Sequence, residues 1–369
     1  MVDTPGSIDA LLIAGARPNF MKIAPLMRAF EAVGLRRRLV HTGQHYDRQM
    51  SEAFFEELQI PQPDLNLGVG GGTAVRQIAD VMRGLEADML AHRPRVTVVV
   101  GDVNSTLAAA LTSNKLGIPV AHVEAGLRSF DRGMPEEVNR IATDAIADWL
   151  YTTEPEANDN LRREGISDER VALVGNMMID TLFQQLELAR SGKPWERLGL
   201  PAGDYALLTL HRPSNVDDPA RLESILRAVH TISGDLPVVF AIHPRTRSRI
   251  EGFGFEQRAE LQGYLPVEPL PYRDTVALVD SARVVLTDSG GLQEETCVLR
   301  VPCLTLRENT ERPITLATGA NQLVGWKGEA ILEAYRKVMQ GPRRIGQPPP
   351  LWDGQAARRI AEHLRRALN

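Results

Sequence analysis

Short apolar runs alternate with amphipathic helical patterns along the chain, and this alternation limits the folds that the sequence can adopt. The apolar runs lie at residues 8–14, 39–42, 96–100, 120–123 and 171–174, and again at 205–210, 238–242, 284–287 and 303–306. Strands that alternate with helices build βαβ units, whose strands lie parallel in one buried sheet. The sequence therefore predicts an α/β protein.

The alternation is interrupted once, by a stretch rich in Gly and Pro at residues 191–203. A chain of 369 residues is long enough for about two domains. We expect two doubly wound, Rossmann-like domains, the first over residues 1–190 and the second over residues 191–350. A final amphipathic pattern at residues 355–368 predicts a terminal helix, with its arginines on a solvated face.

Charge and hydropathy exclude several classes of partner. Lys and Arg number 42 against 47 Asp and Glu, which leaves a net charge of −5. Nucleic-acid binding needs clustered basic residues, so we expect no nucleic-acid partner. No apolar run reaches the roughly 20 residues that cross a bilayer, so we expect no membrane span. Residues 1–16 lack the pattern of a signal peptide, and we expect a cytoplasmic protein.

The sequence also predicts that the protein works without a metal or a bound cofactor. Cys297 and Cys303 are the only cysteines, and they form neither a CxxC pair nor a disulfide framework. The segment GVGGGT at residues 68–73 lacks the third glycine of a dinucleotide-binding fingerprint. We interpret it as a loop before a helix that starts near Thr73.

Three carboxylates follow apolar runs of the first half, where ligands of parallel sheets collect. Asp102 follows the run at 96–100, Glu124 follows the run at 120–123, and Glu136 lies slightly further on. Carboxylates that lie close together suit general acid and base catalysis. Two structural roles stay open: Asp102 caps the next helix, or the carboxylates form a structural network with Arg128 and Arg140.

Other polar residues at predicted strand ends suit an anionic ligand. Arg17 and Lys22 follow the first run and can hold an anion near a helix start. In the second half, His211 and His243 end consecutive strands. The segment DSGGLQEE predicts a phosphate cradle at a helix N-terminus, with a glutamate one turn on for a ribose, and an arginine follows in TERP. A nucleoside diphosphate fits this set better than a bare anion.

These residues lie in motifs that resemble those of the non-hydrolysing UDP-N-acetylglucosamine 2-epimerases. The motifs are, in chain order, GARPNFMK, GDVNSTLA, HVEAGLRS, MPEEVNR, HRPSN, DSGGLQEE and TERP. The resemblance implies two Rossmann-like domains of the glycosyltransferase-B type, with the active site in the interdomain cleft. It further implies that the helix at residues 353–369 packs back on the first domain, and that the protein is a homodimer.

The resemblance also implies the reaction: interconversion of UDP-GlcNAc and UDP-ManNAc through elimination of UDP to a 2-acetamidoglucal, for cell-surface polysaccharide synthesis. The expected catalytic residues are Asp102, Glu124, Glu136 and His211. The expected substrate- and UDP-binding residues are Arg17, Lys22, Arg128, His243, Ser289, Gly290, Gly291, Glu295 and Arg312.

The sequence departs from the common family pattern at Tyr46, Ser214 and Ile314. Tyr46 weakens the case for a regulatory second substrate site. The runs TGQHYD, MSEAFFEEL and EAGLRSF are similar to a branch that acts on UDP-2,3-diacetamido uronic acids, so the sequence is also compatible with a UDP-2,3-diacetamido-2,3-dideoxyglucuronate 2-epimerase. It is compatible as well with a UDP-sugar transferase of the same fold or a non-catalytic nucleotide-sugar sensor.

Overall fold

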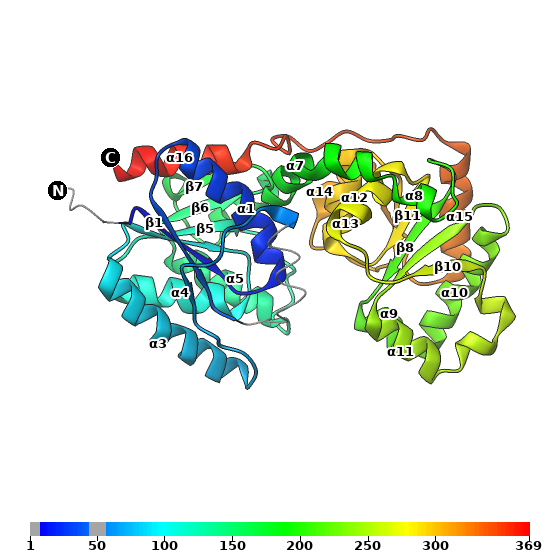
Figure 1. Cartoon of the computed structure of the whole chain (residues 1–369), viewed down its shortest axis with the longest axis horizontal. Coiled ribbons are helices and arrows are strands. Elements are labelled where there is room, and N and C mark those ends of the chain that lie inside the picture. Colours follow the sequence, from blue (N-terminus) through cyan, green and yellow to red (C-terminus); the bar gives the residue numbers. More distant parts are fainter. Residues whose placement is uncertain (1–7, 44–56) are drawn as a thin grey trace. The chain divides into compact units, whose positions relative to one another are not determined.

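The computed structural model describes residues 8–43 and 57–369 of the chain. It divides into two compact units (Figure 1). The first comprises Met1–Thr181 together with Pro350–Asn369, and the second comprises Leu182–Pro349. Among the described residues, no helix is both long and apolar enough to cross a membrane.

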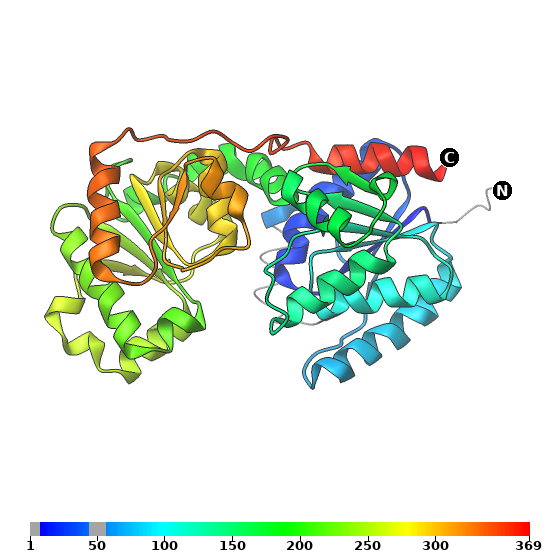
Figure 2. The ribbon, with the colours of Figure 1, turned by 180° about the vertical axis from the view of Figure 1, so that it is seen from behind.

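The first unit is a parallel sheet with helices on both faces. Its strands within the described residues are β1 (Ala10–Ala14), β2 (Arg37–His41), β3 (Leu65–Asn66), β4 (Val96–Val100), β5 (Val120–Ala125), β6 (Trp149–Thr152) and β7 (Val171–Leu173), in the order β3-β2-β1-β4-β5-β6-β7. Its helices are α1 (Arg17–Ala32), α3 (Ala74–His92), α4 (Asn104–Lys115), α5 (Pro135–Ile146), α6 (Pro155–Arg163) and α16 (Ala356–Leu368). Helices α1 and α16 lie together on one face, and α3, α4 and α5 on the other (Figures 1 and 2).

The second unit repeats this plan. Its described strands are β8 (Ala206–Leu210), β9 (Val238–Ile242), β10 (Tyr264–Val267), β11 (Val284–Thr287), β12 (Cys303–Thr305) and β13 (Asn321–Leu323), all parallel in the order β10-β9-β8-β11-β12-β13. Its helices are α8 (Pro194–Arg197), α9 (Pro213–Val216), α10 (Pro219–Ser233), α11 (Pro244–Gly252), α12 (Tyr272–Ser281), α13 (Gly290–Leu299), α14 (Pro313–Ala317) and α15 (Gly328–Gln340). Two Rossmann-like parallel sheets confirm the predicted fold class.

Alternate residues of the strands supply each core. In β8, Ala206, Leu208 and Leu210 are buried against apolar side chains of α10 and α15, among them Leu222 and Ile331. Nearly every strand residue of the central strands is apolar and buried, as expected for a parallel sheet that is covered on both faces. The same pattern made these strands recognisable in the sequence.

Helix α7 (Met177–Gly192) carries the chain from one unit to the other, and the change falls between Thr181 and Leu182. The sequence placed the boundary near residue 190, at the Gly- and Pro-rich stretch that follows this helix. The units divide earlier because a continuous helix, rather than a loop, makes the connection. Nothing in a regular helical pattern marks such a division.

The segment at residues 350–369 returns to the first unit and is anchored there by specific contacts. Asp180 accepts hydrogen bonds from the backbone N–H groups of Ala356 (3.1 Å) and Ala357 (2.7 Å) at the start of α16. Trp352 is buried and donates its indole N–H to the carbonyl of Thr153 at 2.9 Å. The contacts of Asp180 satisfy N–H groups that the first turn of a helix leaves free.

The strand orders determine where a ligand can bind. In the first sheet the order reverses between β1 and β4, and in the second between β8 and β11. In open parallel sheets, ligands bind outside the carboxyl ends of the strands at such a switch point. The residues that follow β1, β4, β8 and β11 are therefore the first to inspect.

Candidate active site residues of the two units

The loop after β1 is joined to the end of β4 through one side chain. Asn19, in the first turn of α1, accepts hydrogen bonds from the N–H groups of Gly15 (3.0 Å) and Ala16 (2.8 Å) and donates to the carbonyl of Val100 (3.0 Å). A Cβ atom at Gly15 would lie 2.5 Å from the hydroxyl of Ser105, so only glycine fits there. Arg17 is the first residue of α1.

Asp102 follows β4 and is held from helix α5. Its carboxylate forms an ion pair with Arg140, and the amide of Asn139 donates to its backbone carbonyl at 2.9 Å. The N-cap of α4 is Val103 and has no side-chain capping bond, so Asp102 does not cap that helix. The carboxylate of Asp102 is 25% exposed and can reach a ligand.

Glu124 lies at the end of β5 in a strained backbone conformation. Its φ is +70°, in the left-handed region that a residue with a Cβ rarely adopts, at a cost on the order of 1–3 kcal/mol. Its carboxylate forms an ion pair with Lys22 of α1. A Cβ atom at Gly101 would lie 3.5 Å from the Lys22 ammonium and 3.7 Å from the Glu124 carboxylate, so this pair lies over the residue that precedes Asp102.

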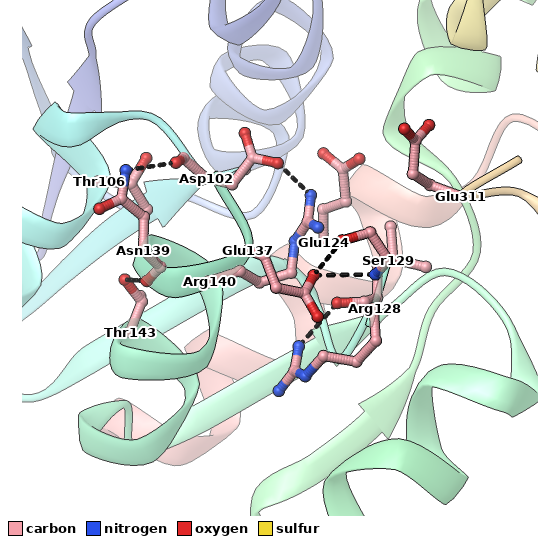
Figure 3. Close-up of polar contacts among 12 residues, drawn as sticks. Asp102, Thr106, Glu124, Arg128, Ser129, Glu137, Asn139, Arg140, Thr143 and Glu311 are labelled. Carbon is pink, nitrogen blue, oxygen red and sulfur yellow. Dashed lines mark hydrogen bonds and ion pairs between the residues drawn. The ribbon is translucent and has the colours of Figure 1, made fainter. Parts of the chain in front are cut away.

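The predicted carboxylates Asp102 and Glu124 therefore lie near each other at the carboxyl ends of β4 and β5 (Figure 3). Asp102 is paired with Arg140 and Glu124 with Lys22. Each cation holds its carboxylate in place by a charge-assisted contact. The catalytic and the structural interpretation of this cluster are thus compatible, because Arg140 forms a network with a carboxylate that remains accessible.

The two adjacent glutamates of α5 have different surroundings. Glu137 is buried and accepts hydrogen bonds from the N–H of Ser129 (2.8 Å), its hydroxyl (3.0 Å) and the N–H of Phe130 (3.0 Å), as Figure 3 shows in part. Glu136 is exposed in the first turn of the same helix. Glu137 therefore stabilises the loop before α5. The catalytic role of Glu136 stays a prediction from the sequence.

Arg128 is a different case from the other predicted binding residues. It forms ion pairs with Asp144 (2.8 Å) and Glu164 (2.6 Å), and only 1% of its side chain is exposed. Although burial alone would lower the pKa of Arg128, its two carboxylate partners keep that pKa above the usual value. These contacts favour a structural role for Arg128 over the expected contact with substrate.

In the second unit, His211 is oriented by a buried carboxylate. Asp288, which follows β11, lies 3.0 Å from Nδ1 of His211 and accepts the backbone N–H groups of His211 (3.1 Å) and Arg212 (2.9 Å). Burial favours a raised pKa for Asp288, but the hydrogen bond and charge of His211 outweigh it and the pKa is lowered. Because Nδ1 faces Asp288, Nε2 is the nitrogen that can exchange a proton with a ligand.

His243 ends β9 and caps the next helix. Its ring centroid lies 5.9 Å from that of His211, and its Nδ1 accepts the N–H of Arg245 at 3.2 Å. Burial, followed by the charges of His211 and Arg245, lowers the pKa of His243. The structure thus brings the two predicted histidines together, with His243 neutral near pH 7.

The predicted phosphate cradle lies at the start of α13. Ser289 is the N-cap residue, and its hydroxyl accepts the N–H of Leu292 at 3.5 Å. Gly290 and Gly291 form the first turn, whose N–H groups point along the helix axis toward any anion at this end. The cradle follows β11, at the switch point of the second sheet.

Glu295 and Arg312 lie next to this helix start with different partners. Glu295 is buried, burial raises its pKa to about 7, and the hydroxyl of Tyr272 donates to it at 2.9 Å. Arg312 forms an ion pair with Glu294. A second ion pair nearby in sequence joins Arg307 and Glu311 at 2.9 Å.

The buried carboxyl of Glu295 makes the second unit sensitive to pH. Its folded pKa of about 7 lies above the usual 4.5, so its contribution to stability is complete below pH 4.5 and is lost as the pH rises through 7. The unfolding free energy of Glu295→Gln should therefore be higher than that of the wild type at pH 8, by up to about 3 kcal/mol. At pH 5 the two unfolding free energies should be equal. Urea unfolding at both pH values measures this, and an advantage that is equal at both would contradict it.

Sequence reasoning missed two residues of these sites, Asp288 and Asn139, and named Arg140 only as a member of a structural network with the carboxylates. Asp288 directly follows an apolar run, the same pattern that identified Asp102. Asn139 and Arg140 lie on α5, and their contact with Asp102 depends on how that helix packs, which no local pattern reveals.

Tyr46 lies outside the described residues, and no cluster of metal-binding side chains occurs within them.

Two parallel, doubly wound units, each with polar residues at its switch point, define a protein of the two-domain Rossmann-like class. A family model described as UDP-N-acetylglucosamine 2-epimerase matches residues 28–365. The chain belongs to the UDP-N-acetylglucosamine 2-epimerase family, which confirms the resemblance seen in its motifs. Membership of an epimerase family argues against a transferase and against a non-catalytic sensor.

Individual relatives agree with this family. A UDP-N-acetylglucosamine 2-epimerase of Methanocaldococcus jannaschii is 41% identical over 96% of this chain and 98% of its own. Its crystal structure in complex with UDP-GlcNAc and UDP has a TM-score of 0.86 and covers 97% of this chain and all of the other. A UDP-2,3-diacetamido-2,3-dideoxy-D-glucuronate 2-epimerase of Pseudomonas aeruginosa is also 41% identical, over 96% of this chain and 98% of its own.

Proposed function

We propose that the protein is a non-hydrolysing UDP-N-acetylglucosamine 2-epimerase that interconverts UDP-GlcNAc and UDP-ManNAc. The observation that carries this proposal is the proximity of Asp102 and Glu124 at the carboxyl ends of β4 and β5, each paired with a cation. The second unit adds the anion-binding start of α13, with Ser289 as its cap and Glu295 one turn on. An acid–base pair and a diphosphate site are what an elimination of UDP requires.

The proposed reaction proceeds in two steps. A carboxylate removes the C2 proton while the C1–O bond breaks, which gives 2-acetamidoglucal and UDP. Protonation of C2 from the opposite face and return of the UDP oxygen to C1 then give the epimer. Two carboxylates from different strands can serve the two faces of the sugar, while the helix N–H groups and His211 stabilise the departing diphosphate.

Proton NMR in heavy water tests this function. Purified protein with UDP-GlcNAc and no other reagent should form UDP-ManNAc, place deuterium at C2 of the product, and release traces of the glycal and UDP. Retention of the C2 proton, or a strict need for added NAD, would overturn the elimination route.

The cytoplasmic location remains a prediction from the sequence.

The identity of the sugar needs its own comparison, because relatives that act on two different sugars are equally similar to this chain, each at 41% identity. We expect UDP-GlcNAc to react. The same NMR assay with UDP-2,3-diacetamido-2,3-dideoxyglucuronic acid serves as the second arm. Turnover of the uronic acid alone would replace the proposed substrate and leave the elimination chemistry intact.

We also propose that the protein is a homodimer, with the outward face of α3 in the contact. Val75 and Leu90, near the two ends of this helix, are 77% and 48% exposed, and we place both side chains in the contact. The wild type should have twice the chain mass of 40.7 kDa in light scattering, and V75D/L90D should have the mass of one chain. Leu188→Asp, an exposed site on α7, is the control. A monomeric wild type, or a double variant that stays dimeric, would contradict this.

A further inference from the structure

A cluster of charged side chains lies buried beside the carboxylate site of the first unit. His122, in the middle of β5, and Asp144, on α5, are both fully buried. Nδ1 of His122 lies 2.6 Å from the Asp144 carboxylate, and Nε2 lies 2.8 Å from the carbonyl oxygen of Gly101. A carbonyl oxygen and an ionised carboxylate can only accept hydrogen bonds, so both ring nitrogens of His122 lie where they can donate one.

Asp144 is the centre of this cluster. Besides its contact with His122, Asp144 forms an ion pair with the guanidinium of Arg128 (2.8 Å) and accepts a hydrogen bond from the backbone N–H of Gly126 (3.1 Å). Burial alone would raise the pKa of Asp144, but the charges and hydrogen bonds of His122 and Arg128 lower it. An ionised, fully satisfied cluster of this kind holds its members in one geometry.

The two backbone groups that the cluster holds flank the candidate catalytic carboxylates. Gly101 directly precedes Asp102, and Gly126 lies two residues after Glu124. Both glycines have positive φ, +71° and +78°, and the N–H of Gly101 donates to Val123 at 3.0 Å. The pairing of β5 with β6 shifts register between Val123 and Ala125, at the position of Glu124.

The strained conformation of Glu124 needs such support. A residue with a Cβ stays in the left-handed region only where its surroundings leave no alternative. The carbonyl of Gly126 accepts the amide of Asn160 at 2.9 Å, and a Cβ at Gly126 would lie 2.5 Å from the carbonyl of Ala157, so this turn is held from α6 as well. His122, two residues before Glu124, and the bond of Gly126 to Asp144, two residues after it, add further constraints to the ion pair with Lys22.

We propose that His122 and Asp144 are positioning residues, which act through the backbone of Gly101 and Gly126 to direct the carboxylates of Asp102 and Glu124. The inference rests on the proposed function, because it assigns those carboxylates to catalysis. It adds a buried, hydrogen-bonded pair that does not touch the substrate but determines where the acid–base groups point.

The test compares Asp144→Asn and His122→Gln with a matched control. Asp88→Asn removes another buried carboxylate of the first unit, which pairs with Arg38 at 2.7 Å and contacts neither glycine. We expect kcat to fall at least about 10-fold in Asp144→Asn and His122→Gln, and KM to stay within about threefold of the wild-type value. Each kcat is calculated per UDP-binding site, and calorimetry counts these sites. Asp88→Asn should keep the wild-type kcat even where its melting temperature falls.

Hydrogen exchange supplies a second readout that does not depend on activity. Amide exchange of peptides covering residues 120–128 should be faster in Asp144→Asn than in wild type and unchanged in Asp88→Asn. Folded Asp144→Asn with wild-type kcat, or with unchanged exchange at residues 120–128, would overturn the proposal. A wild type that epimerises neither UDP-sugar would instead refute the proposed function, while the exchange data would still decide whether the pair holds this backbone.

Discussion

Replacing Asp102 by Asn or Glu124 by Gln should lower kcat at least about 100-fold, because each change removes a proton acceptor and keeps the shape of the side chain. The amide oxygens can still accept hydrogen bonds from Arg140 and Lys22, which pair with the two carboxylates in the wild type. Both variants should therefore fold. The NMR time course of epimerisation measures the loss.

UDP affinity separates a chemical effect from a structural one in these variants. The proposed UDP-binding residues around α13 belong to the second unit, whereas Asp102 and Glu124 belong to the first. Calorimetric titration should therefore give UDP affinities close to wild type. Glu156→Gln, which changes an exposed carboxylate on α6, is the control and should keep full activity. Near-wild-type turnover in Asp102→Asn and Glu124→Gln would return both carboxylates to a structural role.

Trp352→Ala should lower the unfolding free energy of the first unit by about 3–5 kcal/mol, the usual cost of truncating a buried tryptophan. Trp352 is 2% exposed and is among the largest fully buried side chains. Its indole N–H donates to Thr153 at 2.9 Å, so the substitution also leaves a buried carbonyl without this donor. Urea unfolding followed by hydrogen exchange of peptides from β6 and α16 measures the change.

Two further variants sharpen this prediction. Trp352→Phe keeps most of the apolar volume but loses the hydrogen bond, and should cost less than the alanine variant. Arg358→Ala, on the exposed face of α16, should leave the stability close to wild type. A Trp352→Ala protein as stable as the Arg358→Ala protein would show that the segment at residues 350–369 does not stabilise the first unit.

Most of the inner strands could be predicted from the sequence, whereas of the four edge strands only β7 could. The apolar run at residues 238–242 coincides with β9, and the run at 96–100 with β4. The missed strands β3, β10 and β13 lie at sheet edges, where one side lacks a partner strand. They are short, and β10 contains Pro266, which breaks the apolar pattern. The fourth missed strand, β6, begins shortly after α5, so that its apolar residues continue the apolar pattern of that helix.

Strand-end residues were predictable for the site because a parallel sheet brings the ends of its strands together. This rule explains why Asp102 and Glu124 could be paired before their contacts were known. The sequence left Arg128 with two interpretations, ligand binding or a structural network, and could not decide between them, because its partners Asp144 and Glu164 lie 16 and 36 residues further along the chain. Only the packing of α5 and α6 decides whether that guanidinium faces a ligand or the interior.

The path of the chain also determines the order in which the two units can be completed during translation. The second unit is one uninterrupted stretch, so its sequence is complete once residue 349 has left the ribosome. The first unit, although its synthesis begins earlier, lacks Trp352 and α16 until residues 352–368 have been synthesised. During that interval α1 lacks the helix that covers it, and Asp180 lacks the N–H groups of Ala356 and Ala357. A nascent chain that stops at residue 349 thus carries a finished second unit and an unfinished first one.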